Sequence, residues 1–204
     1  EAIFPAQIQD CKAAVRWIRA NAKKYNLDAD HIGAWGSSAG GHLVAMLGTS
    51  GDIADFETES NVGFSSRVQA VCDWFGPTDL LQMNQQAIPL STLDHNAPNS
   101  PESQLVGGPI QKEPYRALAN KANPITYVSA DDPPFLIVHG NQDKLVSHRQ
   151  SELLQESLVD AGVESELQIE VGAGHGFSGG STSKEQLAEQ AVKFFGKHLK
   201  VPTQ

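Results

Sequence analysis

Short apolar runs that alternate with amphipathic helical patterns constrain the fold of this chain more than any other feature. Helical spacing recurs over residues 7–25, 42–48, 148–162 and 184–199. Strand-like segments lie at 28–36 (a turn and a short strand), 68–75, 134–140 and 164–171. Strands that alternate with helices predict an α/β fold, with a mostly parallel sheet and helices on both faces. In such sheets, functional side chains gather beyond the carboxyl ends of the strands.

The first helical segment has a two-sided pattern. Its apolar face repeats every three or four residues and comprises Ile8, Cys11, Val15, Ile18, Ala22 and Tyr25. The basic residues fall largely on the other face: Lys12, Arg16, Arg19 and Lys23.

Composition argues against several classes of partner. The apolar runs are too short to span a bilayer. The net charge of -9 argues against nucleic acid and anionic membranes. The two cysteines, Cys11 and Cys72, lie in apolar patterns and are expected to be buried small hydrophobes. Neither a CxxC nor an HExxH motif occurs, so no zinc site is expected.

Residues Gly36 to Gly40 read Gly-Ser-Ser-Ala-Gly between a short apolar strand and a helical pattern. They match Gly-x-Ser-x-Gly with Ser38 at the centre, the pattern of a strained strand-to-helix turn that exposes a serine hydroxyl. The flanking glycines are expected to let neighbouring backbone pass without clashes. The N–H of Ala39, at the start of the helix, is placed to donate to an oxyanion. Ser38 is therefore the predicted nucleophile, and Ser37 a small turn residue.

A second match to the same pattern is centred on Ser178, in Gly-Phe-Ser-Gly-Gly. It follows a glycine-rich loop and precedes the polar residues STSK, so no strand-turn-helix can form there. We therefore discount Ser178 as a nucleophile.

A serine nucleophile needs a base and an orienting carboxylate, and two later loops supply them. The strand at 134–140 leads into a loop that carries Asp143, and the strand at 164–171 leads into GAGHGF, which carries His175. Ser38, Asp143 and His175 then follow one another in the chain order expected for this kind of turn.

Other histidines and aspartates leave alternatives open. His139 begins the loop of Asp143 and is a second candidate base, whereas His42 is expected to pack beside the site. Asp73 or Asp79, in or just after an earlier strand, could replace Asp143 as the acid. The remaining candidates are expected on polar or helical surface: His31, His95, His148 and His198.

Five segments of the chain carry a resemblance to a known superfamily. They are FPAQIQDCKAAVRWIRANA, HIGAWGSSAGGHLVAML, FGPTDL, ANPITYVSADDPPFLIVHGNQD and GAGHGF. The chain resembles the α/β-hydrolase superfamily and, within it, the bacterial carboxylesterases grouped with acetyl-xylan and feruloyl esterases. The resemblance implies Ser38 as nucleophile, His175 as base and Asp143 as its partner. It implies no cofactor and no metal.

The start of the chain departs from this family. Members begin with several strands and an HGG-type loop that supplies a second oxyanion donor, whereas only EAIFPA precedes the first helix here. The chain therefore resembles roughly the later two-thirds of the fold and is expected to be N-terminally incomplete. Three explanations stay open: a fragment of a longer protein, a homo-oligomer or other chain that covers the exposed sheet edge, and a minimal, impaired hydrolase. The N-terminus looks processed or truncated, so localisation is not predicted.

The resemblance predicts hydrolysis of carboxylic esters, with a short acyl group such as acetyl and a small-molecule or carbohydrate-linked alcohol. One alternative is a peptidase or amidase related to prolyl oligopeptidase. The other is a catalytically impaired hydrolase domain used for binding. A single domain is expected over 1–204, with an irregular, cap-like excursion at about 77–127 that shapes the acyl pocket or is plain surface.

Overall fold

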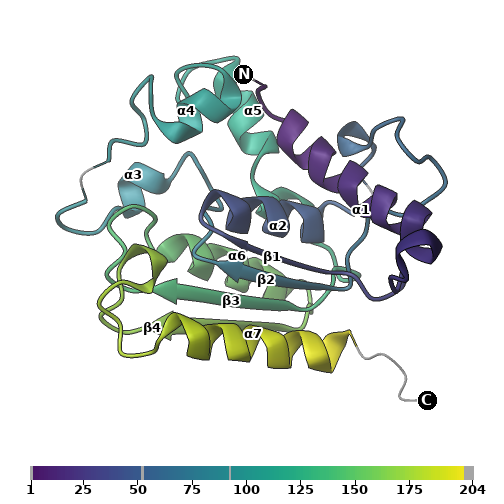
Figure 1. Ribbon diagram of the computed structural model, residues 1–204. Helices are drawn as coiled ribbons and strands as arrows, with labels where there is room; N and C mark the ends of the chain where they lie inside the picture. Colours follow the sequence, from purple (N-terminus) through teal and green to yellow (C-terminus); the bar gives the residue numbers. More distant parts are fainter. Residues whose placement is uncertain (1, 52, 92, 200–204) are drawn as a thin grey trace.

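The structure, a computed structural model, describes residues 2–51, 53–91 and 93–199, and these contain one four-stranded parallel sheet (Figure 1). Its strands follow one another across the sheet in chain order: β1 (Gly33–Ser37), β2 (Ala70–Trp74), β3 (Phe135–Gly140) and β4 (Ser165–Glu170). All neighbours are parallel, so the carboxyl ends of the strands meet at one edge. The predicted α/β fold is confirmed.

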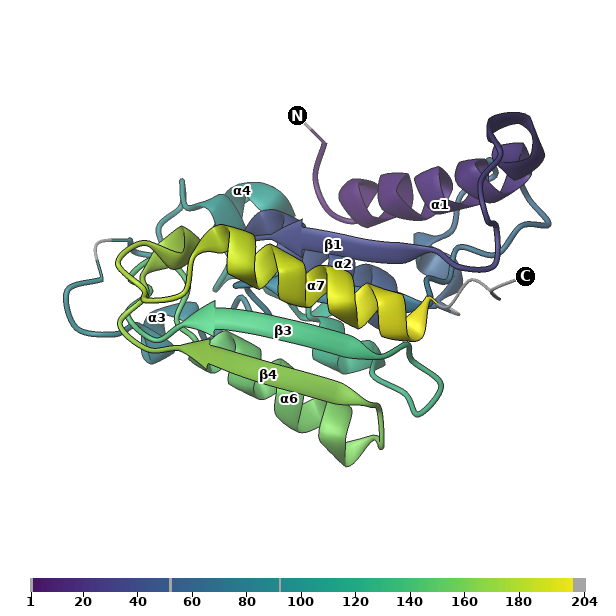
Figure 2. The same ribbon diagram turned by 60° about the horizontal axis from the view of Figure 1, so that its bottom comes forward.

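Helices cover both faces of the sheet, as the alternation predicts. Helices α2 (Ala39–Thr49) and α6 (Arg149–Asp160) pack on one face, and α1 (Ala6–Tyr25) packs against α2. Figure 2 shows α7 (Lys184–His198) alone in front of the other face. Two apolar cores result, one centred on Ile8, Met46, Phe135 and Leu154 and the other on Leu136, Val138, Phe177 and Leu187. Strand β3 is buried along its whole length because it is covered on both sides.

Helix α1 has the predicted bounds, but one residue of its basic face is buried. Lys12 is 0% exposed; its Nζ donates to the Ser50 carbonyl and lies 2.8 Å from Oε1 of Glu57. Lys12 is buried although it belongs to the basic face, because the chain after α2 returns across this side of α1. Tyr25, expected on the apolar face, is half exposed.

The segment between β2 and β3 is irregular, as predicted, and its helices are short. They are α3 (Met83–Gln86), α4 (Pro101–Val106), α5 (Tyr115–Lys121) and the 3₁₀ turn η2 (Pro124–Tyr127); two further 3₁₀ turns elsewhere are η1 (Ala54–Phe56) and η3 (His175–Phe177). Figure 2 shows α3 just past the arrowhead of β3. The segment therefore reaches the edge where the strands end.

Two compositional expectations also have structural outcomes. Cys11 and Cys72 are free thiols, and Cys72 is buried while Cys11 is partly so. Within the described ranges, no helix combines the length and apolar character that crossing a membrane requires.

The turn from β1 into α2 depends on close backbone packing. A Cβ on Gly36 would lie 2.2 Å from the carbonyl oxygen of Gly40, and a Cβ on Gly41 would lie 2.3 Å from Oδ1 of Asp73. At Gly40 the Cβ position is open, with nothing within 4 Å. Glycine is thus required at 36 and 41. The expectation that Gly40 is needed to avoid a clash is wrong, because the second close approach falls one residue later.

We expect Gly36→Ala to destabilise the protein and Gly40→Ala to leave its stability intact. The first methyl group overlaps backbone and should lower the free energy of unfolding by at least about 2 kcal/mol. The second adds a better helix former in α2 and should be neutral or stabilise by up to about 1 kcal/mol. Urea unfolding followed by circular dichroism measures both variants. Equal losses in the two would contradict this account of the turn.

Candidate active site

Ser38 lies at the junction of β1 and α2 in a backbone conformation that non-glycine residues rarely adopt. Its φ is 54° and its ψ is -121°. The Ser38 N–H donates to the Trp74 carbonyl (2.9 Å), and its own carbonyl accepts from the His42 N–H (3.1 Å). These two bonds hold the turn between β2 and α2, so the hydroxyl is directed toward the loops that follow β3 and β4.

The structure brings three of the predicted residues into one hydrogen-bonded series. The Ser38 hydroxyl donates to Nε2 of His175 (3.1 Å), and Nδ1–H of His175 donates to Oδ2 of Asp143 (2.7 Å). Asp143 is buried, whereas a quarter of the His175 side chain is exposed (25%). The imidazole is thus within reach of the hydroxyl proton and is oriented by a carboxylate.

Asp143 is surrounded by hydrogen-bond donors. Its Oδ1 accepts from the backbone N–H groups of Leu145 and Val146, both at 2.9 Å. Its Oδ2 faces His175 and lies 3.4 Å from Nε2 of His139. Burial alone would raise the pKa of Asp143, but the neighbouring His139 ring and the hydrogen bonds from His175 and Val146 outweigh it and hold this pKa well below the usual range. Asp143 is therefore ionised at neutral pH.

His139, the alternative base, is turned away from the serine. Its Nε2–H donates to the Val146 carbonyl (2.8 Å), and its Nδ1 accepts from the Ser151 hydroxyl (2.7 Å). The ring is 0% exposed. His139 thus supports the Asp143 loop, and His175 is the histidine that lies beside Ser38.

The two alternative acids lie elsewhere. Asp73 is fully buried below the turn, where its Oδ1 accepts from the Gly76 N–H (2.9 Å). Burial raises the pKa of Asp73 to about 6, against the opposing effects of Gly76 and His139. Asp79 accepts hydrogen bonds from Leu81 and Gln82 in its own turn. Neither carboxylate bonds to His175 within the described ranges.

Two aromatic rings for which the sequence predicts no role, Phe75 and Phe177, hold His175 in place. The Phe75 ring packs edge to face on the His175 ring at a centroid distance of 4.8 Å, and Phe177 packs on Phe75 at 4.9 Å. Phe75 has a φ of 46°, which is rare for a bulky side chain. The sequence signal was an aromatic residue directly after a buried strand.

The predicted surface position of one histidine is wrong. His95 is only 2% exposed, because it pairs with Glu102 inside the irregular segment. His31, His148 and His198 are partly exposed. His42 packs beside the site as expected; burial lowers its pKa to about 4, so it is neutral, and its Nδ1–H donates to the Pro77 carbonyl (3.1 Å).

Two cavities flank the serine and the histidine. The smaller, of about 180 Å³, is mainly apolar and is lined by Gln7, Ala39, His42, Leu43, Pro77, Leu80, Pro101, Glu102 and Leu105. The N–H of Ala39 is at the first position of α2 and has no backbone acceptor in the described part of the chain. The other cavity is an open cleft of about 400 Å³ lined by Gln142, Lys144, Leu145, Gly172, Gly174, His175 and Ser178. A hollow of about 490 Å³ lies at the opposite ends of β3 and β4, away from these residues.

The parallel sheet, its covering helices and the strand-turn-helix at Ser38 define the class: this is an α/β-hydrolase fold. Within that class the chain belongs to the BD-FAE family, whose model matches residues 1–158. The superfamily resemblance of the sequence is thereby confirmed.

Similar sequences and similar solved structures agree with this family assignment. Esterase LipQ of Mycobacterium tuberculosis is 32% identical over 197 residues, which cover 94% of this chain and 44% of LipQ. The chain thus spans less than half of the length of that curated relative. A solved truncated form of a carbohydrate esterase from gut microbiota is 35% identical with a TM-score of 0.83, covering 98% of this chain and 71% of that one. Butyrate-bound esterase 2 of Thermogutta terrifontis is 26% identical with a TM-score of 0.68, covering 97% and 67%.

The raised pKa of Asp73 leads to a prediction for stability. A buried acid whose pKa rises from 3.8 to about 6 on folding reduces stability as the pH climbs through that interval, and the full cost is reached above it. Asparagine cannot ionise. The stability of Asp73→Asn relative to the wild type should therefore increase by roughly 2–3 kcal/mol between pH 4 and pH 7. Urea unfolding at both pH values tests this; a constant difference would contradict it.

Proposed function

We propose that the chain hydrolyses carboxylic esters through Ser38, His175 and Asp143. The observation that carries this proposal is the series of hydrogen bonds from the serine hydroxyl through the imidazole to the buried carboxylate, at 3.1 and 2.7 Å. The names of the similar proteins, an esterase and a carbohydrate esterase, support ester bonds as the target.

In this mechanism His175 accepts the Ser38 proton at Nε2 while the serine oxygen attacks the ester carbonyl. Asp143 accepts from Nδ1–H, which fixes the tautomer, and it stabilises the imidazolium that forms. His175 then gives the proton to the departing alcohol, and the acyl group stays on Ser38. Water repeats the sequence on the acyl-enzyme and releases the carboxylic acid.

The Ala39 N–H stabilises the oxyanion in both steps. It stands at the N-terminus of α2, where the unpaired N–H groups and the helix dipole favour negative charge. In other serine hydrolases, loss of one oxyanion donor slows turnover by about a hundred- to a thousandfold. Ala39 also lines the small cavity, so the carbonyl carbon of the ester lies at its mouth.

The small cavity is the proposed acyl pocket, and its size favours a short chain. Its volume of about 180 Å³ is below the range of about 300–1,000 Å³ typical of sites for drug-sized ligands. Leu43, Leu80 and Leu105 give it an apolar wall. The butyrate-bound title of a similar solved esterase supports the same class of acyl group. The alcohol part of the ester then binds in the open cleft on the other side of His175.

Replacing the nucleophile tests the reaction. Ser38→Ala should lower kcat for p-nitrophenyl acetate by more than about a thousandfold, because covalent catalysis is lost. Ser37→Ala, at the adjacent exposed position, is the matched control and should keep its activity. Turnover that survives in Ser38→Ala would overturn the proposal. A faster reaction with a chromogenic dipeptide amide would instead indicate an amidase, and an unlabelled Ser38 after fluorophosphonate treatment would indicate a binding domain.

A series of p-nitrophenyl esters tests the acyl pocket. We expect kcat/KM to fall once the acyl chain is longer than butyryl, since the cavity is then full. Leu43→Ala should enlarge the cavity and move the preference toward longer chains. Leu145→Ala, which trims the open cleft instead, should leave the preference unchanged. The same shift in both variants would show that the small cavity does not hold the acyl group.

A further inference from the structure

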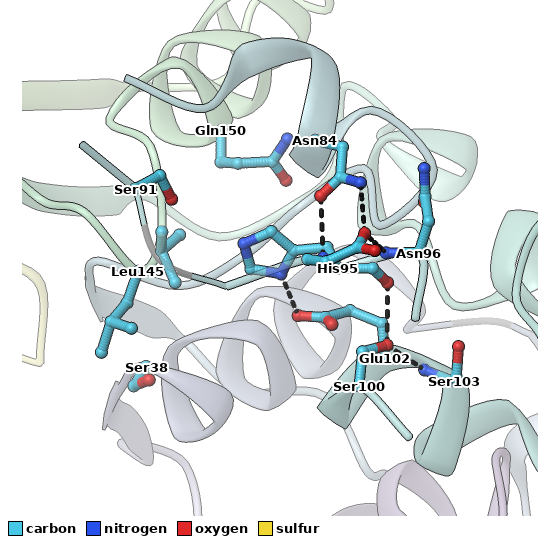
Figure 3. Close-up of polar contacts among 12 residues, drawn as sticks. Ser38, Asn84, Ser91, His95, Asn96, Ser100, Glu102, Ser103, Leu145 and Gln150 are labelled. Atoms are coloured by element: carbon cyan, nitrogen blue, oxygen red, sulfur yellow. Dashed lines mark hydrogen bonds and ion pairs between the residues drawn. The ribbon is translucent and has the colours of Figure 1, made fainter. Parts of the chain in front are cut away.

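The structure contains a second buried pair of a histidine and a carboxylate, His95 and Glu102 (Figure 3). Nδ1 of His95 lies 2.8 Å from Oε1 of Glu102, and the two residues are 2% and 7% exposed. His95 lines neither cavity beside Ser38, so it has no direct part in the proposed hydrolysis. Apolar side chains of similar size often stabilise a protein as well as a buried ionic pair does, so stability alone does not account for the pair.

Hydrogen bonds connect His95 to two short helices. Its N–H donates to Oδ1 of Asn84 (2.7 Å) in α3, and its carbonyl accepts from the Ser100 hydroxyl (2.8 Å). The same Ser100 oxygen accepts from the Ser103 N–H (3.1 Å) and caps α4, whose first turn contains Glu102. Figure 3 shows these bonds as one connected series from Asn84 to Ser103. His95 therefore joins α3 to α4.

The chain around His95 is itself anchored to the sheet and its helices. The Ser91 hydroxyl donates to the Lys144 carbonyl (2.6 Å) in the loop that follows β3. Oε1 of Gln86, in α3, accepts from the side-chain amide of Gln150 (2.6 Å), in α6. His95 is therefore held at a fixed place relative to the edge of the sheet.

Helix α4 forms one wall of the small cavity that is the proposed acyl pocket. Pro101, Glu102 and Leu105 line this cavity together with Ala39 and Leu43 of α2. The cavity thus lies between the helix that begins at the proposed nucleophile and a helix of the irregular segment. A movement of α4 away from α2 would lengthen the acyl chain that fits.

The two ends of α4 are held in different ways. At its C-terminal end, Val106 is buried in the core, and the Leu105 carbonyl accepts from the Phe4 N–H (2.8 Å). At its N-terminal end, the capping serine and Glu102 both bond to His95. A helix of six residues is too short to be stable without such contacts. His95 therefore determines where the N-terminal end of α4 lies.

The pair adds direction to the packing of α4. Apolar contacts depend little on the angle between two groups, whereas a hydrogen bond to a carboxylate requires a set distance and direction. Oε2 of Glu102 is buried and makes no hydrogen bond within the described residues, so its carboxylate is held through Oε1. The position of the Glu102 side chain in the cavity wall therefore depends on His95.

We propose that the His95–Glu102 pair positions α4 and thereby restricts the pocket to short acyl chains. His95 is a positioning residue: it contacts no substrate and acts through Glu102, which lines the pocket. This inference rests on the proposed ester hydrolysis and on the small cavity as its acyl pocket. With the pair intact, α4 keeps the cavity at about 180 Å³. Without the pair, the N-terminal end of α4 moves more freely and a longer acyl chain fits.

A double variant tests the pair without leaving a buried charge unpaired. His95→Leu/Glu102→Met replaces both partners by apolar side chains and should keep the unfolding temperature of the wild type. We then compare kcat/KM for p-nitrophenyl hexanoate with kcat/KM for p-nitrophenyl butyrate. The hexanoate-to-butyrate ratio should rise about three- to tenfold over that of the wild type, because part of the discrimination against two extra methylene groups is lost.

Two further variants are the controls for the double variant. His95→Asn keeps a side-chain N–H close to the place of Nδ1, so it can still donate to Glu102 and should keep a ratio close to that of the wild type. His31→Leu/Asp28→Met is the matched control, because it removes a histidine–carboxylate contact of the same 2.8 Å length on the surface. It should leave the ratio unchanged.

Three outcomes of this comparison would overturn the inference. A stable double variant with the wild-type ratio would mean that the pair does not limit the pocket. An equal loss of kcat/KM with both esters, together with a lower unfolding temperature, would mean that the pair only supports the fold. A shift in His95→Asn as large as in the double variant would mean that the hydrogen bond to Glu102 is not what holds α4.

Binding of the acyl products separates this inference from the proposed reaction. Butyrate and hexanoate are titrated into Ser38→Ala, with and without the double substitution, and binding is followed by protein NMR. The double substitution should lower the Kd of hexanoate relative to that of butyrate about three- to tenfold. If the wild type hydrolyses neither ester but this change occurs, the reaction is wrong and the positioning role stands. If esters are hydrolysed and neither ratio changes, the positioning role is wrong and the reaction stands.

Discussion

The close backbone packing at the end of β1 is the constraint on which the rest of the site depends. Gly36 passes against the backbone of Gly40, and Gly41 passes against Asp73. Only this approach allows α2 to start where β1 stops, with Ser38 held in a rarely adopted conformation between them. The strain is balanced by hydrogen bonds to β2 and α2 and by the burial of Met46 and Val71 in the core below. Packing of the core thus fixes the position of the Ser38 hydroxyl group through this turn.

The parallel arrangement of the strands brings the other two residues of the site, Asp143 and His175, to Ser38. Residues separated by 137 positions, Ser38 and His175, meet because every strand delivers its following loop to the same edge of the sheet. Each loop is then fixed by its own local contacts: Asp143 by backbone N–H groups and His175 by the ring of Phe75. A sheet of this kind needs only short loops to assemble side chains from three distant parts of a sequence.

Local patterns predict the strands and helices well, and they also single out the three residues that the structure brings together, Ser38, Asp143 and His175. The turn at Ser38 has a steric signature, and Asp143 and His175 each follow a buried strand directly, so strand order alone placed them. The burial of Lys12 and the wrongly predicted surface position of His95 have a different origin, since irregular chain covers each of these side chains. A periodic pattern describes one helix or strand and carries no information about an irregular loop that later covers it. For the same reason Phe75 went unnoticed, because its role lies in a contact with a loop a hundred residues away.

The hydrogen bond from Ser91 to the Lys144 carbonyl has a consequence for how this chain can change. Surface loops normally tolerate insertions, because a change in their length does not disturb the helices and strands that they connect. Here the irregular segment between β2 and β3 is hydrogen-bonded to Lys144, the residue after Asp143. The Lys144 carbonyl therefore links this segment to the loop that carries the carboxylate paired with His175. A change in the length of the chain before Ser91 would therefore displace the loop that positions the Asp143 carboxylate. Substitutions of side chains are therefore a more accessible way to change the shape of the substrate site than insertions or deletions in this segment.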